Sequence, residues 1–275
     1  MSLIELRRAD AGYPSGLADL PRPPDPLWIE GDLAVFDHVP RIAIVGTRRL
    51  TGYGERVARE LATAVATGGA VVVSGLAQGI DSAAHSGALD AGAPTVAVLG
   101  EGIGSFHATA GRRRAQLAQR CVLVSPYPPD APALPWMFAK RNAIIAALAA
   151  LVVVVEAPPD SGALITAGDA RRLGRPLFAV PGPLGSAASV GTNALIADGL
   201  ARAVTGADTL LVALGLAAAT APSTPPSLLA DALAAGPLAP DALAELLGLS
   251  AASVAASCVA DPRLVTLPDG RISLR

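Results

Sequence analysis

Cysteine, lysine and aromatic side chains are scarce in this chain of 275 residues, and each scarcity narrows what the protein can be. The two cysteines, Cys121 and Cys258, lie far apart and outside any metal-ligand spacing. They indicate neither a disulfide framework nor a metal site, so a reduced cytoplasmic protein is the simplest interpretation. Aromatic residues make up only 3% of the chain, and Lys140 is its single lysine. Arginine therefore carries almost all of the positive charge.

Long hydrophobic runs are absent as well, although hydrophobic residues make up 52% of the chain and charged ones only 16%. The most apolar run, residues 148–155, ends at Glu156 and is far shorter than the roughly 18 residues that a membrane span needs. No basic segment followed by an apolar core opens the sequence. We therefore expect neither a membrane span nor a signal peptide.

The common signatures of nucleotide-dependent enzymes and hydrolases are missing too. Gly100-Glu101-Gly102 lacks the third glycine of a dinucleotide-binding turn, and the single lysine does not follow a glycine as a Walker A motif requires. Neither G-x-S-x-G nor H-E-x-x-H occurs. We expect His38 and His107 to be loop residues. His85 lies one helical turn after Asp81 and could help to orient that carboxylate.

Positive charge is concentrated in the middle of the chain, even though the net charge is −2. Residues 41–207 carry fifteen basic and ten acidic side chains, whereas both flanking segments are acidic. Such an asymmetry reports on binding partners rather than on the fold, and here it indicates an anionic partner. The basic side chains cluster at Arg48-Arg49, residues 112–114, Lys140-Arg141 and Arg171-Arg172.

The middle of the chain alternates short valine-rich and isoleucine-rich strands with helical patterns. Uninterrupted hydrophobic strands indicate a sheet buried on both faces, and their alternation with helices predicts an α/β fold, a Rossmann-like, doubly wound and mostly parallel sheet. Ligands of such sheets bind beyond the carboxyl ends of the strands. The expected strands are residues 41–45, 70–73, 95–99, 122–125, 151–155 and 176–180, and the expected helices are 54–67, 82–91, 111–120, 141–149 and 163–173.

Composition predicts a second, smaller domain after the sheet domain. We expect residues 1–40 to form an extension packed on a sheet domain of residues 41–209, and residues 210–227 to form a linker rich in proline and small residues. Helical patterns at 228–235, 240–247 and 250–260, followed by a hairpin turning at Asp269-Gly270, predict a winged helix over 228–275.

Three segments lead from a strand through a small-residue turn to a helix N-terminus, a geometry that favours phosphate binding. They are residues 42–54, 70–85 and 161–170. Asp81, in the first turn of its helix, can serve as a general base, but stabilisation by the helix dipole is the favoured interpretation. A fourth candidate is Lys140-Arg141-Asn142, which follows the apolar anchors Trp136-Met137-Phe138.

Six motifs in order give the chain a resemblance to the DNA-processing protein A family (DprA, also called Smf). They are IAIVGTRRLTGYG (42–54), VVVSGLAQGIDSAAHSGAL (71–89), FAKRNAIIAAL (138–148), VVVVEAPPDSGALITAGDA (152–170), GRPLFAVPG (174–182) and GTNALIADG (191–199). The resemblance implies a homodimer that binds single-stranded DNA, protects it and loads RecA during natural transformation and recombination. It implies no catalysis, metal or cofactor. The small helical domain that precedes Tyr13-Pro14 in many members is not expected here.

The resemblance also assigns site residues. It places the family's phosphate-contacting arginine at Arg48 and its basic R-N-R segment at Arg141-Asn142, where Ala143 replaces the second arginine and Lys140 is positioned to compensate. Together with the glycine turns, it predicts a DNA site made of Gly46, Thr47, Arg48, Ser74, Gly75, Gly79, Asp81, Lys140, Arg141, Asn142, Ser161, Gly162 and Thr166.

The few aromatic side chains limit base stacking to Trp136, Phe138, Tyr53 and Phe106, so binding is expected to be mostly electrostatic and weakly sequence-selective. The alternative is a nucleotide-processing enzyme of the phosphoribohydrolase type, but Gly191-Thr192 lacks the glycine pair and the glutamate of that motif. Residues 250–260 carry no basic side chain, so we expect the C-terminal domain to serve in protein contact rather than in DNA binding.

Overall fold

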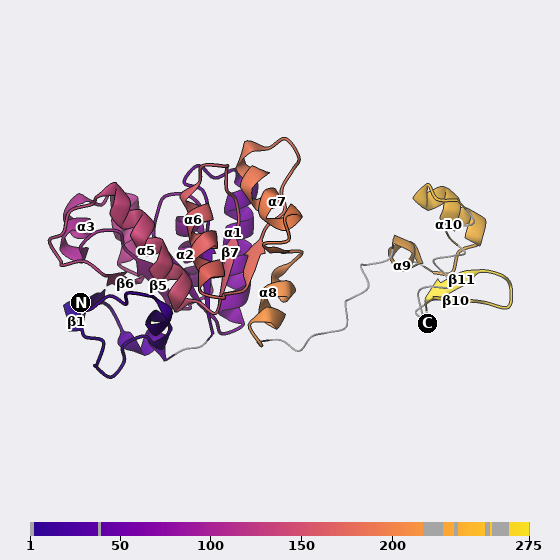
Figure 1. Ribbon diagram of the computed structural model, residues 1–275. Helices are drawn as coiled ribbons and strands as arrows, with labels where there is room; N and C mark the ends of the chain where they lie inside the picture. The colour runs from indigo at the N-terminus through magenta and orange to yellow at the C-terminus, as the bar shows by residue number, and fades with distance from the viewer. Residues whose placement is uncertain are drawn as a thin grey trace. The chain divides into compact units, whose positions relative to one another are not determined.

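A computed structural model describes residues 3–37, 40–216, 228–233, 236–250, 254 and 264–274. The chain divides into two compact units, Met1–Ala218 and Ala219–Arg275 (Figure 1). The first unit holds the large sheet and the second a two-stranded hairpin. Among the described helices, none combines the length and the hydrophobicity needed to cross a membrane.

Nine strands form the sheet of the first unit, in the order β1-β2-β6-β5-β4-β3-β7-β8-β9. In this order, each strand from β6 through β5, β4, β3, β7 and β8 to β9 pairs in parallel with the next. Beside β6, the strands β2 and β1 add an antiparallel edge. The predicted α/β fold, a mostly parallel doubly wound sheet, is therefore confirmed. The strands are β1 (Leu3–Leu6), β2 (Leu27–Glu30), β3 (Arg41–Val45), β4 (Val71–Ser74), β5 (Thr95–Val98), β6 (Val122–Ser125), β7 (Leu151–Val154), β8 (Leu177–Ala179) and β9 (Arg202–Ala203).

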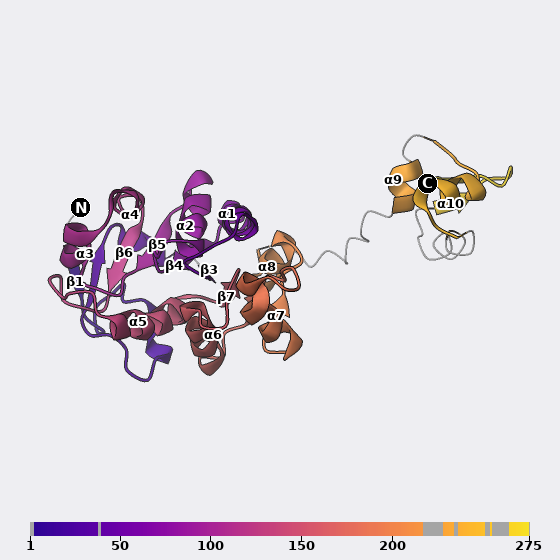
Figure 2. The ribbon, with the colours of Figure 1, turned by 90° about the horizontal axis from the view of Figure 1, so that it is seen from above.

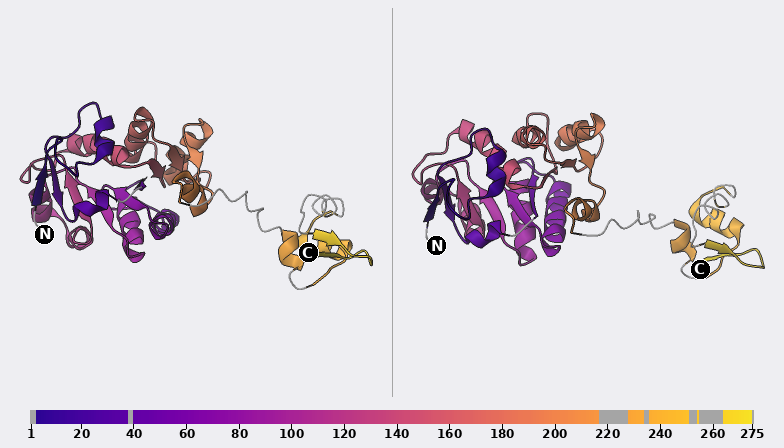
Figure 3. Two further views of the ribbon diagram at one scale, coloured as in Figure 1. Left: turned by 90° about the horizontal axis from the view of Figure 1, so that it is seen from below. Right: turned by 60° about the horizontal axis from the view of Figure 1, so that its bottom comes forward.

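Helices cover both faces of this sheet, as Figures 2 and 3 show. Within β3, Ile42 and Ile44 pack towards α1, α2 and α8, whereas Ala43 and Val45 pack towards α5, α6 and α7. Side chains on successive strand residues point to opposite faces, so an unbroken hydrophobic strand supplies both cores. The helices are α1 (Gly52–Thr67), α2 (Ile80–Asp90), α3 (Ile103–Thr109), α4 (Arg112–Ala118), α5 (Pro135–Leu148), α6 (Gly162–Arg172), α7 (Val190–Ala197) and α8 (Ala207–Ala213).

The bounds of the predicted strands lie within one residue of the prediction, and those of β3 and β6 agree with it at both ends. The largest difference among the predicted helices is at α5, which begins at Pro135 rather than at residue 141. A proline in the first turn is compatible with a helix start because its missing N–H has no intrahelical partner there. The earlier start adds a helical turn and a half in front of Lys140.

The N-terminal segment does more than pack on the sheet domain. Its strands β1 and β2 extend the sheet through pairs such as Ile29 with Val124. A 3-10 helix over Ser15–Asp19 buries Leu17 completely and packs against α5. Residues 1–40 therefore contribute one edge of the nine-stranded sheet.

The second unit contains α9 (Leu228–Leu233), α10 (Pro240–Leu247) and the antiparallel pair β10 (Leu264–Thr266) and β11 (Ile272–Leu274). Its described core holds Leu229, Leu233, Leu243, Val254, Leu264 and Ile272. The hairpin turns at Asp269-Gly270 as predicted, and Gly270 takes a φ of 83° that favours glycine. Residues 210–216 of the predicted linker belong instead to the end of α8 and the turn after it, where Leu210 is fully buried and Leu214 and Leu216 pack against the core. The rest of the predicted linker, 217–227, and most of the predicted third helix, 250–260, lie outside the described residues, so the winged helix stays a prediction.

Candidate nucleic-acid interface

A cavity of about 870 Å³ opens beyond the carboxyl ends of β3 and β7. These strands are neighbours in the sheet, but α1 follows β3 on one face and α6 follows β7 on the other. The connections diverge at this switch point, which leaves a crevice where ligands of doubly wound sheets bind. The lining comes from the turn after β3, the loop after β7, one side of α5 and a short stretch at 186–188.

The turn after β3, residues 46–49, is held from both sides by backbone hydrogen bonds. Thr47 donates its N–H to the carbonyl of Glu156 at 2.7 Å, and its own carbonyl accepts from the N–H of Ile80 at 3.2 Å. A Cβ on Gly79 would lie 2.3 Å from the oxygen of Thr47, and the φ of Gly79 is +97°. At the N-terminus of α2, predicted to hold a phosphate, the N–H of Ile80 is therefore bonded to a protein carbonyl. Gly79 lacks a side chain because the Thr47 carbonyl lies against it, not because a ligand does.

The N-terminus of α1 is also occupied. The buried carboxylate of Glu156 accepts from the N–H of Thr51 at 2.9 Å and from its hydroxyl at 2.5 Å. The Thr51 hydroxyl in turn caps the helix by accepting from Gly54 at 3.2 Å. No local signal in the sequence predicts this Glu156–Thr51 contact, because the two residues are 105 positions apart.

The third predicted phosphate cradle, at the start of α6, faces the cavity. Ser161 caps this helix by accepting from the N–H of Ala163, and both Ser161 and Gly162 line the cavity. Asn142 of α5 reaches across and donates to the carbonyl of Gly162 at 3.2 Å. Thr166 also lines the cavity, although only 1% of it is exposed. The positive end of the α6 dipole and these polar groups make this side of the cavity suitable for an anion.

Arg48, with the neighbouring Arg49, supplies the exposed positive charge of the cavity, whose lining also includes the exposed carboxylate of Asp160. Arg48 lies in the turn after β3 beside Gly46 and Thr47, which also line the cavity. Its guanidinium carbon lies 5.7 Å from the centre of the Phe138 ring, a cation–π arrangement. Lys140 is exposed on the same helix as Phe138 but is not among the lining residues. The structure thus joins Gly46, Thr47, Arg48, Asp81, Asn142, Ser161, Gly162 and Thr166 around one cavity and leaves Lys140 on an adjacent face of α5.

Arg141, predicted to contact DNA, is buried behind the cavity with only 4% of its surface exposed. It donates to the carbonyl of Val98 at the end of β5, and a Cβ on Gly75 would lie 1.9 Å from its Nη1. Burial lowers the pKa of Arg141 to about 10, against the opposing attraction of Asp81. The guanidinium is therefore charged at neutral pH, and Gly75 is small because Arg141 occupies the space beside it.

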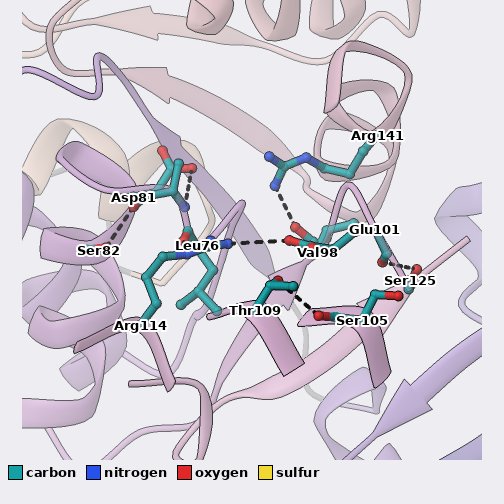
Figure 4. Close-up of polar contacts among 11 residues, drawn as sticks. Leu76, Asp81, Ser82, Val98, Glu101, Ser105, Thr109, Arg114, Ser125 and Arg141 are labelled. Atoms are coloured by element: carbon teal, nitrogen blue, oxygen red, sulfur yellow. Dashed lines mark hydrogen bonds and ion pairs between the residues drawn. The ribbon is translucent and has the colours of Figure 1, made fainter. Parts of the chain in front are cut away.

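Asp81 organises the loop that follows β4 (Figure 4). Its Oδ2 accepts from the N–H groups of Gly75 at 3.1 Å and Ala77 at 3.4 Å, on either side of Leu76. Leu76 has a φ of +53°, which is uncommon for a leucine, and Arg114 donates to its carbonyl at 3.0 Å. Burial raises the pKa of Asp81, while Arg141 and the backbone N–H groups favour its ionised form. Asp81 lies in the first turn of α2 as predicted, but its hydrogen bonds go to this loop.

Three further predictions about single residues are wrong. Ser74 is fully buried, and its hydroxyl donates to the carbonyl of Ile44 at 2.6 Å. Phe106 is completely buried, so it offers no surface for a base. His85 does not orient Asp81, because its Nδ1 pairs with the hydroxyl of Thr95 at 2.8 Å. Burial, with a smaller contribution from Arg141, lowers the pKa of His85 to about 3.

The structure also places His107 and Arg114, one of the three arginines at 112–114. His107 lies in α3, where Nε2 is 3.0 Å from Glu30, rather than in a loop, and His38 lies outside the described residues. Within the 112–114 cluster, Arg114 points inwards, over the Phe106 ring at 4.9 Å and 3.8 Å from the buried Glu101. Three adjacent arginines in a sequence give no signal for which of them turns towards the sheet.

The chain is thus an α/β protein with a doubly wound sheet, and its candidate site at the switch point combines exposed arginine with an open helix N-terminus, groups that suit an anion. The family model described as DNA recombination-mediator protein A matches residues 5–215, and the chain belongs to this family.

Among its relatives, the protein Smf of Escherichia coli is 42% identical over 68% of this chain and 50% of its own length. The solved structure of DNA processing protein A from Streptococcus pneumoniae has a TM-score of 0.71 and 34% identity, over 77% of this chain and 74% of that one. A solved structure of DNA processing protein A from Helicobacter pylori, described for its single-stranded DNA binding mode, has a TM-score of 0.69 and 28% identity, over 78% and 96%. The chain spans about half the length of several curated relatives that it matches.

Proposed function

We propose that this protein binds single-stranded DNA through its phosphate backbone at the cavity beyond β3 and β7. The observation that carries the proposal is the pairing of exposed Arg48 with the open N-terminus of α6 across one cavity. Cations and backbone N–H groups are the groups that contact DNA phosphates without reading sequence. The single-stranded DNA binding of the Helicobacter pylori relative supports the same ligand for this chain.

The site is proposed to act without catalysis, metal or cofactor. Its two buried carboxylates already have protein partners, Asp81 in the loop after β4 and Glu156 at Thr51. The exposed carboxylate that lines the cavity is Asp160, so a phosphoribohydrolase-type reaction would have to depend on it. Incubation with nucleoside monophosphates should release no free base, and single-stranded oligonucleotides should stay intact.

We further propose that the protein acts in the cytoplasm as a homodimer that protects single-stranded DNA and loads RecA in natural transformation and recombination. Membership in a family of recombination mediators supports this role. Sedimentation analysis should give twice the mass of the 27.4 kDa chain. The intact protein should shorten the lag of RecA ATP hydrolysis on single-stranded DNA already covered by a single-strand-binding protein.

The decisive test of DNA binding is a salt titration with fluorescent single-stranded and double-stranded oligonucleotides. Each lost phosphate contact lowers the slope of log affinity against log salt by about 0.7 for single strands. Arg48→Ala should weaken binding and show this smaller slope. Arg171→Ala is the matched control, because Arg171 is exposed near the far end of α6, away from the strand ends that form the cavity. Equal affinity for both kinds of DNA, or equal slopes for intact protein and Arg48→Ala, would contradict the proposal.

A further inference from the structure

Trp136 is an exposed aromatic side chain next to the cavity, in the first turn of α5. It is 57% exposed, in a chain with only two tryptophans. Pro135 and Phe138, its neighbours on α5, line the cavity. Exposed aromatic rings are the groups on which the bases of a single strand stack, so the position of this indole beside the proposed DNA site suits it for that contact.

The indole is held in a defined orientation. The ring of Tyr127 meets it edge-on, with centroids 6.2 Å apart and planes at 88°. Tyr127 is itself buried, and its hydroxyl donates to the carbonyl of Met137 at 3.2 Å. An orientation fixed by a buried neighbour reduces the entropy lost when a second ring stacks on the indole.

Lys140, the only lysine of the chain, lies on the same side of α5 as Trp136. The two residues are four positions apart, which places them about one helical turn from each other on one surface. Lys140 is exposed, so its ammonium is free to meet an anion. An aromatic face and a cation one turn apart match the base and the phosphate of a nucleotide.

We propose that Trp136 and Lys140 form a second nucleotide-binding position, where the base of a single strand leaving the cavity stacks on the indole and its phosphate pairs with the ammonium. This inference rests on the proposed function, because the strand reaches Trp136 from the cavity along α5. Duplex DNA keeps its bases stacked inside the helix, so the position contributes to single-strand preference.

The experiment compares three variants by fluorescence anisotropy with a single-stranded oligonucleotide of about 20 nucleotides across a salt series. Trp136→Leu should weaken binding roughly five- to tenfold at every salt concentration, since stacking on an aromatic side chain is lost. Its salt slope should equal that of the intact protein, because no phosphate contact is removed. Trp136→Phe should restore most of the affinity, and Lys140→Ala should lower the slope by about 0.7.

A direct readout uses Trp28→Phe, in which Trp136 is the only remaining tryptophan. Its emission should be quenched as the oligonucleotide saturates the protein, and duplex of the same length should quench it less. Unchanged emission at saturation, or unchanged affinity of Trp136→Leu while Arg48→Ala loses affinity, would overturn this inference and leave the cavity site standing. A Trp136→Leu variant that alters only the sedimentation mass would assign the indole to a protein interface instead. Absence of binding by the intact protein would overturn both proposals.

Discussion

Replacement of Arg141 separates a buried structural role from a direct DNA contact. The guanidinium is buried beside Asp81 and bonds to the end of β5, so Arg141→Met removes the positive charge and keeps much of the side-chain volume. A hydrogen bond from a charged donor contributes about 1.5–3 kcal/mol, and its loss leaves the Val98 carbonyl without this donor and the buried Asp81 carboxylate without the attraction of the guanidinium. Native domains have a free energy of unfolding of only about 5–15 kcal/mol, so the expected loss is large.

The assay is urea unfolding followed by tryptophan fluorescence. Trp28 and Trp136 both lie in the first compact unit, so their emission reports on unfolding of the sheet domain. We expect Arg141→Met to lose about 1.5–3 kcal/mol of unfolding free energy. The double variant Asp81→Asn/Arg141→Met should recover part of this loss, because the buried charge of Asp81 is then removed as well. Exposed Arg48→Ala, as control, should change stability by less than about 0.5 kcal/mol.

One result would refute this reasoning. If Arg141→Met unfolded at the same urea concentration as the intact protein and bound single-stranded DNA with a salt slope smaller by about 0.7, Arg141 would be a phosphate ligand. That outcome would restore the role that the family resemblance assigned to it. A loss of stability with an unchanged salt slope in the folded variant supports the buried role.

Three further predictions concern the loop, pH and the second unit. Gly79→Ala should destabilise the protein by about 2–4 kcal/mol and weaken DNA binding, because the positive φ of Gly79 and the nearby Thr47 carbonyl both oppose a Cβ. Urea unfolding measures the stability and fluorescence anisotropy the binding; wild-type values in both would contradict the prediction. The free energy of unfolding should fall as the pH drops from about 6.5 towards 3, because in this range His85 is protonated in the unfolded state but stays neutral when buried in the folded state. His85→Asn should therefore make the urea midpoint depend less on pH. Parallel curves for the variant and the intact protein would show that another group is responsible. Deletion of residues 217–275 should leave single-strand affinity within a few-fold, whereas a hundredfold loss would place DNA contacts in the second unit.

The sheet and the location of its site could be read from local sequence. Buried parallel strands are short, uninterrupted hydrophobic runs, so β3 and β6 were bounded correctly from composition alone. Their alternation with helices implied a doubly wound sheet and a ligand site beyond the strand ends, where the cavity lies. Several elements of the first unit were not predicted. The strands β1 and β2 lie within a segment expected only to pack on the sheet, and the helices α3, α7 and α8 have weak helical patterns in the sequence.

Which groups face the cavity was decided by tertiary structure. Lys140 and Arg141 are adjacent in sequence, yet one is exposed and the other is buried beside Asp81. Successive residues of a helix point about 100° apart, so a basic pair must split between two directions, and only packing against the sheet decides which residue turns inwards. In the same way, the N–H groups at a helix N-terminus bind any hydrogen-bond acceptor. The sequence of α2 does not show whether its N-terminus binds a phosphate or, as observed at Ile80, the carbonyl of Thr47. Local sequence determined which groups are able to bind an anion, and the folding of distant segments determined which of them remain open to one.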